Sequence, residues 1–297
     1  MDLLPLSVVV ATRQPWPFAR ECLEHLCPQA DAAGAEIILA DGSGVGLSEE
    51  YAGQHPCVQW MKIPGASVFD LRARAVAVAC GEVVALTEDH CLVHPEWCER
   101  ILAAHRRHPS ALAIAGAVEN GSTRLLMDKA NFFLTFGPFM PPFATRLTRR
   151  VPPPSNVSFK RSTYLDVVPS PGWIEFALNP SLCAQGAVAF DDNLRVNHIQ
   201  SHGFWGTCAS HFHNGRSTTG LVSAIMAPKR QHERLWLCLK KPIAMVRETI
   251  TSLSEKQMPR RHIIGSIPLV TLLAVCHVAG EVTGLIKGPG ESPWRLS

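Results

Sequence analysis

Three ionisable residues in a row, Glu88, Asp89 and His90, follow a short apolar run in the first third of the chain. The run, Val83 to Leu86, is typical of a strand that is buried on both faces of a parallel sheet. Ligands of open α/β sheets bind beyond the carboxyl ends of the strands. Carboxylates suit magnesium and manganese, so this cluster is a candidate site for a divalent cation. The alternative is that an acid here only caps the helix expected near Pro95.

Two further candidate binding residues, Thr12 and Asp41, follow the first two expected strands, at residues 6–11 and 36–40. A helix is expected between these strands, after Pro17. Strand, helix and strand with an acid at the second strand's tip are typical of the opening of a mononucleotide-binding unit. Asp41 could accept hydrogen bonds from a base or a ribose. The alternative is a plain turn, since Asp-Gly-Ser-Gly is ordinary turn chemistry.

A strand over residues 58–63 and a helix over residues 67–80 come next. The predicted buried face of this helix consists of Val68, Leu71, Ala75 and Val78. One of its two arginines, Arg72 or Arg74, could bind a diphosphate in bidentate fashion, and we assign Arg74 to the donor site. A solvated arginine is the alternative.

Composition limits the class of protein. The chain has 297 residues, of which 46% are hydrophobic and 18% charged, so it can bury a sizeable core. The net charge of +3 argues against a general nucleic-acid binder. The ten cysteines are scattered, which suggests a reducing compartment, and the first residues lack the basic region of a signal peptide. We therefore expect a cytoplasmic protein.

Taken together, these segments resemble a family 2 glycosyltransferase with the GT-A fold. The resemblance rests on the order and spacing of the first strand, the Asp41 turn and the acidic cluster, and it covers roughly residues 6 to 205. It implies an α/β fold, with a Rossmann-like, mostly parallel sheet flanked by helices. We expect a C-terminal helical appendage beside it, which divides the chain at residues 1–227 and 228–297.

The resemblance also implies roles for individual residues. In the family an acidic motif binds the divalent metal that bridges the diphosphate of a sugar nucleotide; here His90 replaces the last aspartate. We assign Asp89, His90 and His198 to the metal, which is Mg²⁺ or Mn²⁺. Donor binding is assigned to Glu88, Asp89 and Asn156, besides Thr12, Asp41 and Arg74.

The resemblance further implies a catalytic base at Glu175, where the family usually has Glu-Asp and this chain has only the glutamate. Its neighbours Trp173, Ile174 and Phe176 would partly desolvate the carboxylate and raise its pKa toward the range of a general base. The alternative is a glutamate that is favoured at a helix N-terminus by the helix dipole.

A zinc site is permitted by the spacing of four residues later in the chain, His202, Cys208, His211 and His213. No second Cys-x-x-Cys arm accompanies them. We expect residues 213–216 to form a loop near the diphosphate instead.

The last part of the chain is predicted to be helical. Residues 231–255 form a basic amphipathic helix, which suits an anionic membrane surface. Residues 263–280 are apolar but only just long enough for a membrane span, so an interfacial helix fits better than a full crossing. A buried packing helix or a dimer contact is the alternative.

The expected function is the inverting transfer of a sugar from a nucleotide-diphosphate sugar to a hydroxyl acceptor, which is lipid-linked or a saccharide. The expected place is the inner face of the cell membrane, to which the protein is peripheral. We expect no nucleic-acid partner, and a homo-oligomer is possible. Two alternatives stay open: a nucleotidyltransferase, which would release pyrophosphate, and a non-catalytic membrane-bound subunit of the same fold.

Overall fold

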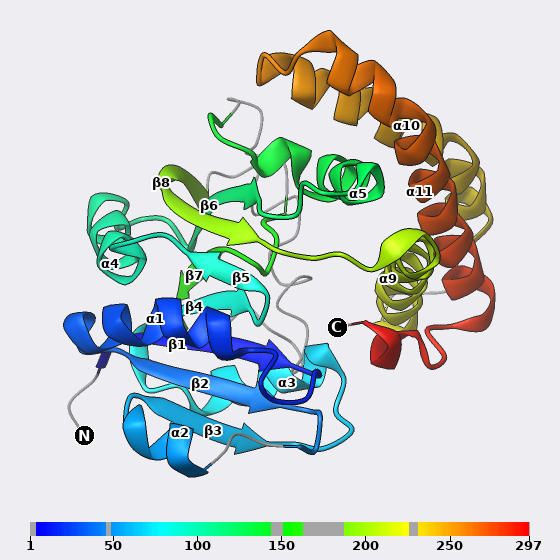
Figure 1. Cartoon of the computed structure of the whole chain (residues 1–297). Coiled ribbons are helices and arrows are strands. Elements are labelled where there is room, and N and C mark those ends of the chain that lie inside the picture. The colour runs from blue at the N-terminus through cyan, green and yellow to red at the C-terminus, as the bar shows by residue number, and fades with distance from the viewer. Residues whose placement is uncertain (1–3, 46–48, 144–150, 163–186, 226–230, 297) are drawn as a thin grey trace. The chain divides into compact units, whose positions relative to one another are not determined.

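The computed structural model describes residues 4–45, 49–143, 151–162, 187–225 and 231–296 (Figure 1). The chain forms two compact units. The first consists of Met1–Glu119 and Pro141–Ile199 with Ser297, and the second of Asn120–Met140 and Gln200–Leu296. The predicted division after residue 227 lies inside the second unit.

The first unit is built on a single mixed sheet. Its elements are β1 (Leu4–Thr12), α1 (Arg20–Ala33), β2 (Glu36–Asp41), α2 (Glu49–Gln54), β3 (Val58–Lys62), α3 (Val68–Val78), β4 (Gly81–Glu88), β5 (Cys91–Val93), α4 (Trp97–Arg107), β6 (Ala113–Asn120), β7 (Val157–Lys160) and β8 (Val188–His198). The strand order is β3-β2-β1-β4-β7-β6-β8-β5. Strands β3, β2, β1 and β4 are parallel, whereas β7 runs antiparallel to both β4 and β6. Helices α1 and α4 contact each other, and α3 contacts β1 and β2 (Figure 1). The predicted α/β sheet flanked by helices is confirmed.

The parallel register brings the tips of three strands together. In β1 the side chains of Leu6 and of Val8 to Val10 are fully buried, as expected for a central strand covered on both faces. Thr12 pairs with Asp41 of β2, and Ala11 pairs with Glu88 of β4. The residues that follow these strands therefore share one edge of the sheet.

Helix α3 begins at a serine cap, since Ser67 Oγ accepts a hydrogen bond from the backbone amide of Asp70. The predicted burial of Val78 is wrong, because its side chain is 43% exposed. Val78 has the spacing of the buried stripe, seven residues after Leu71, but it is the last residue of α3, where the helix ends and its side chain stays exposed.

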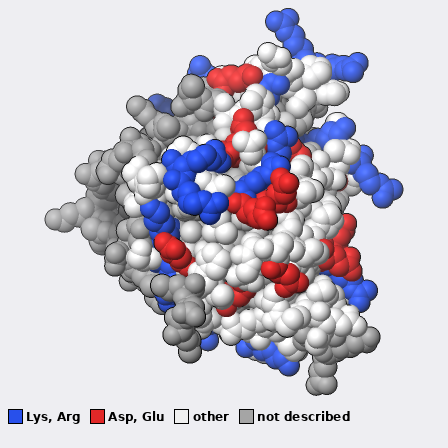
Figure 2. Space-filling model, turned by 90° about the vertical axis from the view of Figure 1, so that its left-hand side faces the viewer, with Lys and Arg blue, Asp and Glu red and all other residues white. Residues whose placement is uncertain are grey.

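Charged side chains of opposite sign lie beside one another on the side of the molecule drawn in Figure 2. Arg100 and Arg107 of α4 pair with Glu96 at 2.7 Å and with Asp191 at 2.6 Å. The Arg100–Glu96 pair is exposed and contributes little stability, whereas Asp191 is buried.

The second unit is helical. Its elements are α5 (Leu126–Phe136), η1 (Gly137–Phe139), α9 (Gly203–Ile225), α10 (Gln231–Glu255), α11 (Arg260–Lys287) and η4 (Ser292–Arg295). Helix α10 has the predicted bounds. The loop predicted at residues 213–216 is wrong, because these residues lie inside α9. The reason is a close helix crossing: Gly215 faces the backbone of His277, and Gly280 faces that of Phe212, where no side chain would fit.

Helix α11 is long and apolar enough to cross a membrane by length and composition alone. It packs on α9, α10 and α5 of its own unit, and Val270, Leu273 and Ala274 are buried. The core helix of a soluble protein has the same properties, so membrane association stays a prediction.

Candidate donor and metal site

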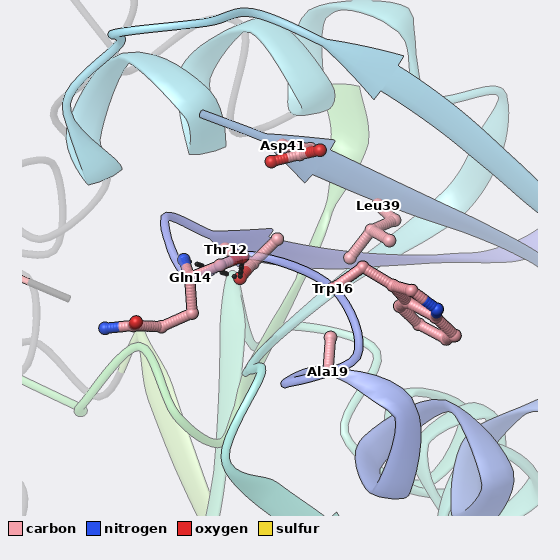
Figure 3. A pocket seen from close by; sticks show the side chains of 6 residues that line it. All are labelled: Thr12, Gln14, Trp16, Ala19, Leu39 and Asp41. Carbon is pink, nitrogen blue, oxygen red and sulfur yellow. Dashed lines mark hydrogen bonds between the residues drawn. The ribbon is translucent and has the colours of Figure 1, made fainter. Parts of the chain in front are cut away.

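A shallow pocket lies at the ends of β1 and β2. Figure 3 shows its lining side chains, which are those of Thr12, Gln14, Trp16, Ala19, Leu39 and Asp41. Thr12 Oγ1 accepts a hydrogen bond from the backbone amide of Gln14 at 3.2 Å, which fixes the start of the loop that carries Trp16. Two of the predicted donor-binding residues, Thr12 and Asp41, therefore line one pocket with an indole ring between them and α1.

The carboxylate of Asp41 is held in place by two donors. Its Oδ1 accepts a hydrogen bond from the amide of Ser43 at 2.7 Å, and its Oδ2 accepts one from Trp60 Nε1 at 3.3 Å. The Lys62 ammonium lies 3.7 Å from the centroid of the Trp60 ring. A carboxylate oxygen can accept more than one hydrogen bond, so Asp41 keeps acceptor capacity for a ligand.

The acidic cluster at the end of β4 meets His198 from the end of β8. Glu88 Oε2 lies 3.6 Å from His90 Nε2 and 3.5 Å from His198 Nε2, and the two imidazole nitrogens are 3.1 Å apart. The pairing of β5 with β8 places Cys91 directly opposite His198. This register brings His198 to the cluster although more than a hundred residues separate it from His90.

Asp89 does not face Glu88 and His198 directly but contacts the far side of the His90 ring. Its Oδ1 lies 2.7 Å from His90 Nδ1, on the side of the imidazole ring opposite the nitrogen that faces Glu88 and His198. Burial lowers the pKa of His90, but the hydrogen bond to Asp89 and the charge of Glu88 outweigh it and raise that pKa above its usual value. Of the three residues assigned to the metal, His90 and His198 meet directly, and Asp89 reaches the centre only through His90.

The arginine at this site is Arg72. Its Nη2 donates to Glu88 Oε1 at 2.8 Å, and the side chains of Arg72 and Glu88 are 7% and 16% exposed. Burial raises the pKa of Glu88, but the hydrogen bond from His198 and the charges of His90 and Arg72 outweigh it and hold the pKa at about 2. Arg74, which we assigned to the donor, is exposed on another side of α3.

The sequence pattern could have identified Arg72. It lies four residues after Val68 and three before Ala75, which is the spacing of the buried stripe of α3, whereas Arg74 is off that stripe.

The donor set could hold a metal ion. The ligand atoms of Glu88, Cys91 and His198 all lie within 4.8 Å of one another, and His90 Nε2 lies 3.6 Å from Glu88 Oε2 and 3.1 Å from His198 Nε2. Burial raises the pKa of the Cys91 thiol well above its usual value. Cys91 was not among the predicted ligands, and nothing in its sequence surroundings indicated a role.

Asn156 is buried and bonded entirely within the protein. Its Nδ2 donates to the backbone oxygens of Ala117 and Leu194 at 2.8 and 2.9 Å, and its Oδ1 accepts from Trp97 Nε1 at 3.1 Å. A contact between this amide and the donor would require one of these bonds to break. Its assignment to the donor site stays a prediction.

Glu175 lies outside the described residues, so its assignment as catalytic base also stays a prediction. Of the four residues with zinc-like spacing, three lie on α9, namely Cys208, His211 and His213, and the two histidines have other partners. His211 Nε2 lies 2.8 Å from Asn131 Oδ1, and His213 Nδ1 lies 3.0 Å from Ser292 Oγ.

Comparison with known families decides the classification. The family model described as glycosyl transferase family 2 matches residues 7–168, which is more than half of the chain. The chain belongs to this family. It is therefore a glycosyltransferase, and the match covers the tips of β1, β2 and β4 together with Asn156. No curated protein matches the chain.

Solved structures of glycosyltransferases resemble this one. The mannosyltransferase PcManGT from Pyrobaculum calidifontis, in complex with GDP-Man and Mn²⁺, has a TM-score of 0.56 at 14% identity, over 96% of this chain and 90% of that one. S. aureus TarS 1-349 has a TM-score of 0.48 at 11% identity, over 94% and 90% of the two chains. Mannosyl-3-phosphoglycerate synthase from Rubrobacter xylanophilus has a TM-score of 0.45 at 16% identity, over 67% and 68%. With the family match, the first of these confirms the predicted GT-A fold.

Proposed function

We propose that this family 2 glycosyltransferase moves a sugar, with inversion, from a nucleotide-diphosphate sugar to a hydroxyl group of a saccharide or a lipid-linked acceptor. The observation that carries the proposal is the convergence of Asp41, Glu88 and His198 at one edge of the sheet. This arrangement offers an acceptor for the nucleoside beside a donor set for a cation.

The donor would lie across the tips of β1, β2 and β4. Asp41 would accept hydrogen bonds from the nucleoside, and the Trp16 side of the pocket would cover an apolar ring face. The similar Pyrobaculum protein holds GDP-Man and Mn²⁺, and we propose a donor and a cation of these classes here, with Mg²⁺ as the other candidate. When bound at Glu88 and its histidine neighbours, the cation would neutralise charge on the departing diphosphate.

The acceptor hydroxyl must lose a proton as it attacks the anomeric carbon, and we propose that Glu175 takes this proton. Glu175→Gln keeps the shape of the side chain but cannot accept the proton. We expect kcat to fall by about 10² to 10⁴, while the donor Kd stays within about twofold. Loss of donor binding with turnover preserved would refute this role.

A product assay tests the reaction itself. The enzyme is incubated with Mn²⁺ and either a panel of sugar nucleotides or a nucleoside triphosphate with a sugar phosphate. We expect nucleoside diphosphate from the sugar nucleotide, and Asp41→Asn should weaken donor binding about 10- to 100-fold, as for a lost hydrogen bond to a charged group. Pyrophosphate release from the triphosphate would indicate a nucleotidyltransferase instead, and the absence of both products a non-catalytic subunit.

We also propose that the enzyme works at the inner face of the cell membrane and binds it through α10. An exposed stripe of this helix carries Trp236 and Ile243, which are 71% and 67% exposed, together with Lys240 and Arg247. Apolar side chains between cations on one helix face suit an anionic lipid surface.

Sedimentation with vesicles tests this membrane proposal. We expect binding to phosphatidylcholine vesicles only when they contain phosphatidylserine, and at least about tenfold weaker binding for Trp236→Ser. Phe18→Ser, which removes an exposed apolar residue of the first unit, is the matched control. A dimer that dissociates in Trp236→Ser, without any vesicle binding by the wild type, would assign the stripe to a second copy of the chain.

A further inference from the structure

The nitrogen and oxygen atoms at the centre of the cluster have the spacing of ligands around one ion. Atoms bound at about 2.0 to 2.2 Å to one metal, at tetrahedral or octahedral angles, lie about 2.8 to 3.6 Å apart. Glu88 Oε2, His90 Nε2 and His198 Nε2 form a triangle with sides of 3.1, 3.5 and 3.6 Å. All three sides fall in that range, so one cation above the triangle would reach all three atoms.

Two facing imidazole nitrogens require something between them. His90 Nε2 and His198 Nε2 are 3.1 Å apart, and their rings form a T-shaped pair with an interplanar angle of 89°. Two lone pairs repel at this distance, so the nitrogens must share either a proton or a cation. Both side chains are more than nine-tenths buried, and a separation of 3.1 Å leaves no room for a water molecule between the two nitrogens.

Hydrogen bonds with other protein groups fix His90 and Glu88 at the atoms that do not face the centre of the cluster. Asp89 Oδ1 fixes His90 through Nδ1, at 2.7 Å, and Arg72 Nη2 fixes Glu88 through Oε1, at 2.8 Å. These contacts leave His90 Nε2 and Glu88 Oε2 directed to the centre. A carboxylate behind a histidine, on the ring nitrogen that does not bind the ion, is the usual support of a metal-binding histidine.

We propose that Glu88, His90 and His198 are the three ligands of one divalent cation, that Asp89 is a positioning residue and not a ligand, and that the site prefers Mn²⁺, Co²⁺ or Zn²⁺ to Mg²⁺. The proposal rests on the proposed function, since it defines the cation at the donor site. Imidazole nitrogen suits these transition metals, whereas Mg²⁺ requires oxygen ligands and releases its water reluctantly.

Cys91 is the competing ligand. Its sulfur lies within 4.8 Å of the ligand atoms of Glu88 and His198. We assign His90 as the third ligand because its Nε2 lies 3.6 Å from Glu88 Oε2 and 3.1 Å from His198 Nε2, the spacing of atoms around one ion. The two arrangements differ in one measurable respect, because a thiolate ligand gives Co²⁺ an intense charge-transfer absorption that nitrogen and oxygen ligands do not.

The first experiment titrates the full-length wild type with Mg²⁺, Mn²⁺, Co²⁺ and Zn²⁺ by calorimetry, without any sugar nucleotide. We expect one site per chain and at least about tenfold tighter binding of Co²⁺ and Zn²⁺ than of Mg²⁺. Equal or tighter Mg²⁺ binding would overturn the metal preference. Co²⁺ absorption and the nitrogen couplings in pulsed EPR of bound Mn²⁺ identify the ligands.

The second experiment uses variants. His90→Gln and His198→Gln should each remove one nitrogen coupling, whereas Asp89→Asn should keep both couplings. Asp89→Ala should weaken binding about 10- to 100-fold, and Asp89→Asn, which still accepts a hydrogen bond from Nδ1, should weaken it less. Thermal melting without metal checks that each variant folds.

Two results would overturn the ligand assignment. One is an unchanged nitrogen coupling in His90→Gln, and the other is a thiolate band of Co²⁺ that disappears in Cys91→Ser. Because no substrate is present, the outcome is separate from that of the proposed function: a protein with these ligands but no sugar transfer contradicts only the latter.

Discussion

Replacing Asn156 by alanine separates a structural role from donor binding. The amide makes three buried hydrogen bonds, to Ala117, Leu194 and Trp97. Each is worth about 1 kcal/mol net, and buried partners that lose a bond cost more. We therefore expect Asn156→Ala to lower the free energy of unfolding by about 3 to 5 kcal/mol, which corresponds to a fall in Tm of roughly 10 °C.

The partner of the amide oxygen provides an internal check. Trp97→Phe removes one of the three bonds and should cost about 1 to 2 kcal/mol. In the double variant with Asn156→Ala, the two effects should fall short of additivity by about 1 kcal/mol, because the variants remove the same bond. Urea unfolding of the four proteins gives this coupling energy.

Calorimetric titration with the sugar nucleotide completes the test of Asn156. If the fold alone needs this amide, the fraction of Asn156→Ala that stays folded should bind the donor with a Kd close to that of the wild type. A Tm within about 1 °C of the wild type, together with a tenfold weaker donor Kd, would refute the structural reasoning. It would establish Asn156 as a donor-binding residue.

Three further pairs of measurements test the structure. Arg72→Met should lower the free energy of unfolding by about 3 kcal/mol because it breaks a buried ion pair, whereas Arg74→Met on the same helix should change it by less than about 0.5 kcal/mol; equal losses in urea would contradict the pairing. Burial holds the pKa of His105 at about 4, below the unfolded value of 6.5. The unfolded chain therefore gains its proton first as the pH falls. Stability should drop by about 2 kcal/mol between pH 7 and pH 5, and His105→Gln should flatten that slope in urea titrations. Gly280→Ala should cost about 1 to 3 kcal/mol because a methyl group would collide with α9, and Gly265→Ala, which has open space, should stabilise α11 by about 0.5 to 1 kcal/mol; calorimetric melting that shows the same sign for both would exclude the close crossing.

Local sequence patterns were sufficient to predict the strands of the parallel half of the sheet. The apolar runs of β1, β2 and β4 end at Thr12, Asp41 and Glu88, and the structure pairs these strands in parallel register. The bounds of α10 were also predicted from periodicity and composition. In these segments, the local order of apolar and polar residues determines the secondary structure.

Two of the errors concern contacts between distant segments. The sequence does not show that β5 pairs with β8, so the meeting of Cys91 and His198 could not be derived from spacing. Similarly, Gly215 is typical of a loop when only the sequence is known. Its role becomes clear once α11 is placed, because the missing side chain lets the backbone of α11 pack closely against α9. Neither α2 nor α5 was predicted.

From the charges at the end of β4 we infer that binding of the cation and binding of the sugar-nucleotide donor depend on each other. Metal binding requires both histidines to be neutral, and then Arg72 balances only one of the two carboxylates of Glu88 and Asp89. Without the metal, the raised pKa of His90 favours a proton on that imidazole, which offsets the remaining negative charge. A divalent cation in place of this proton makes the site positive, which favours a diphosphate. Each ligand should therefore raise the affinity for the other by the same factor, as linkage requires. A site built of two imidazoles and one carboxylate is thus better matched to an anionic donor when it holds its metal.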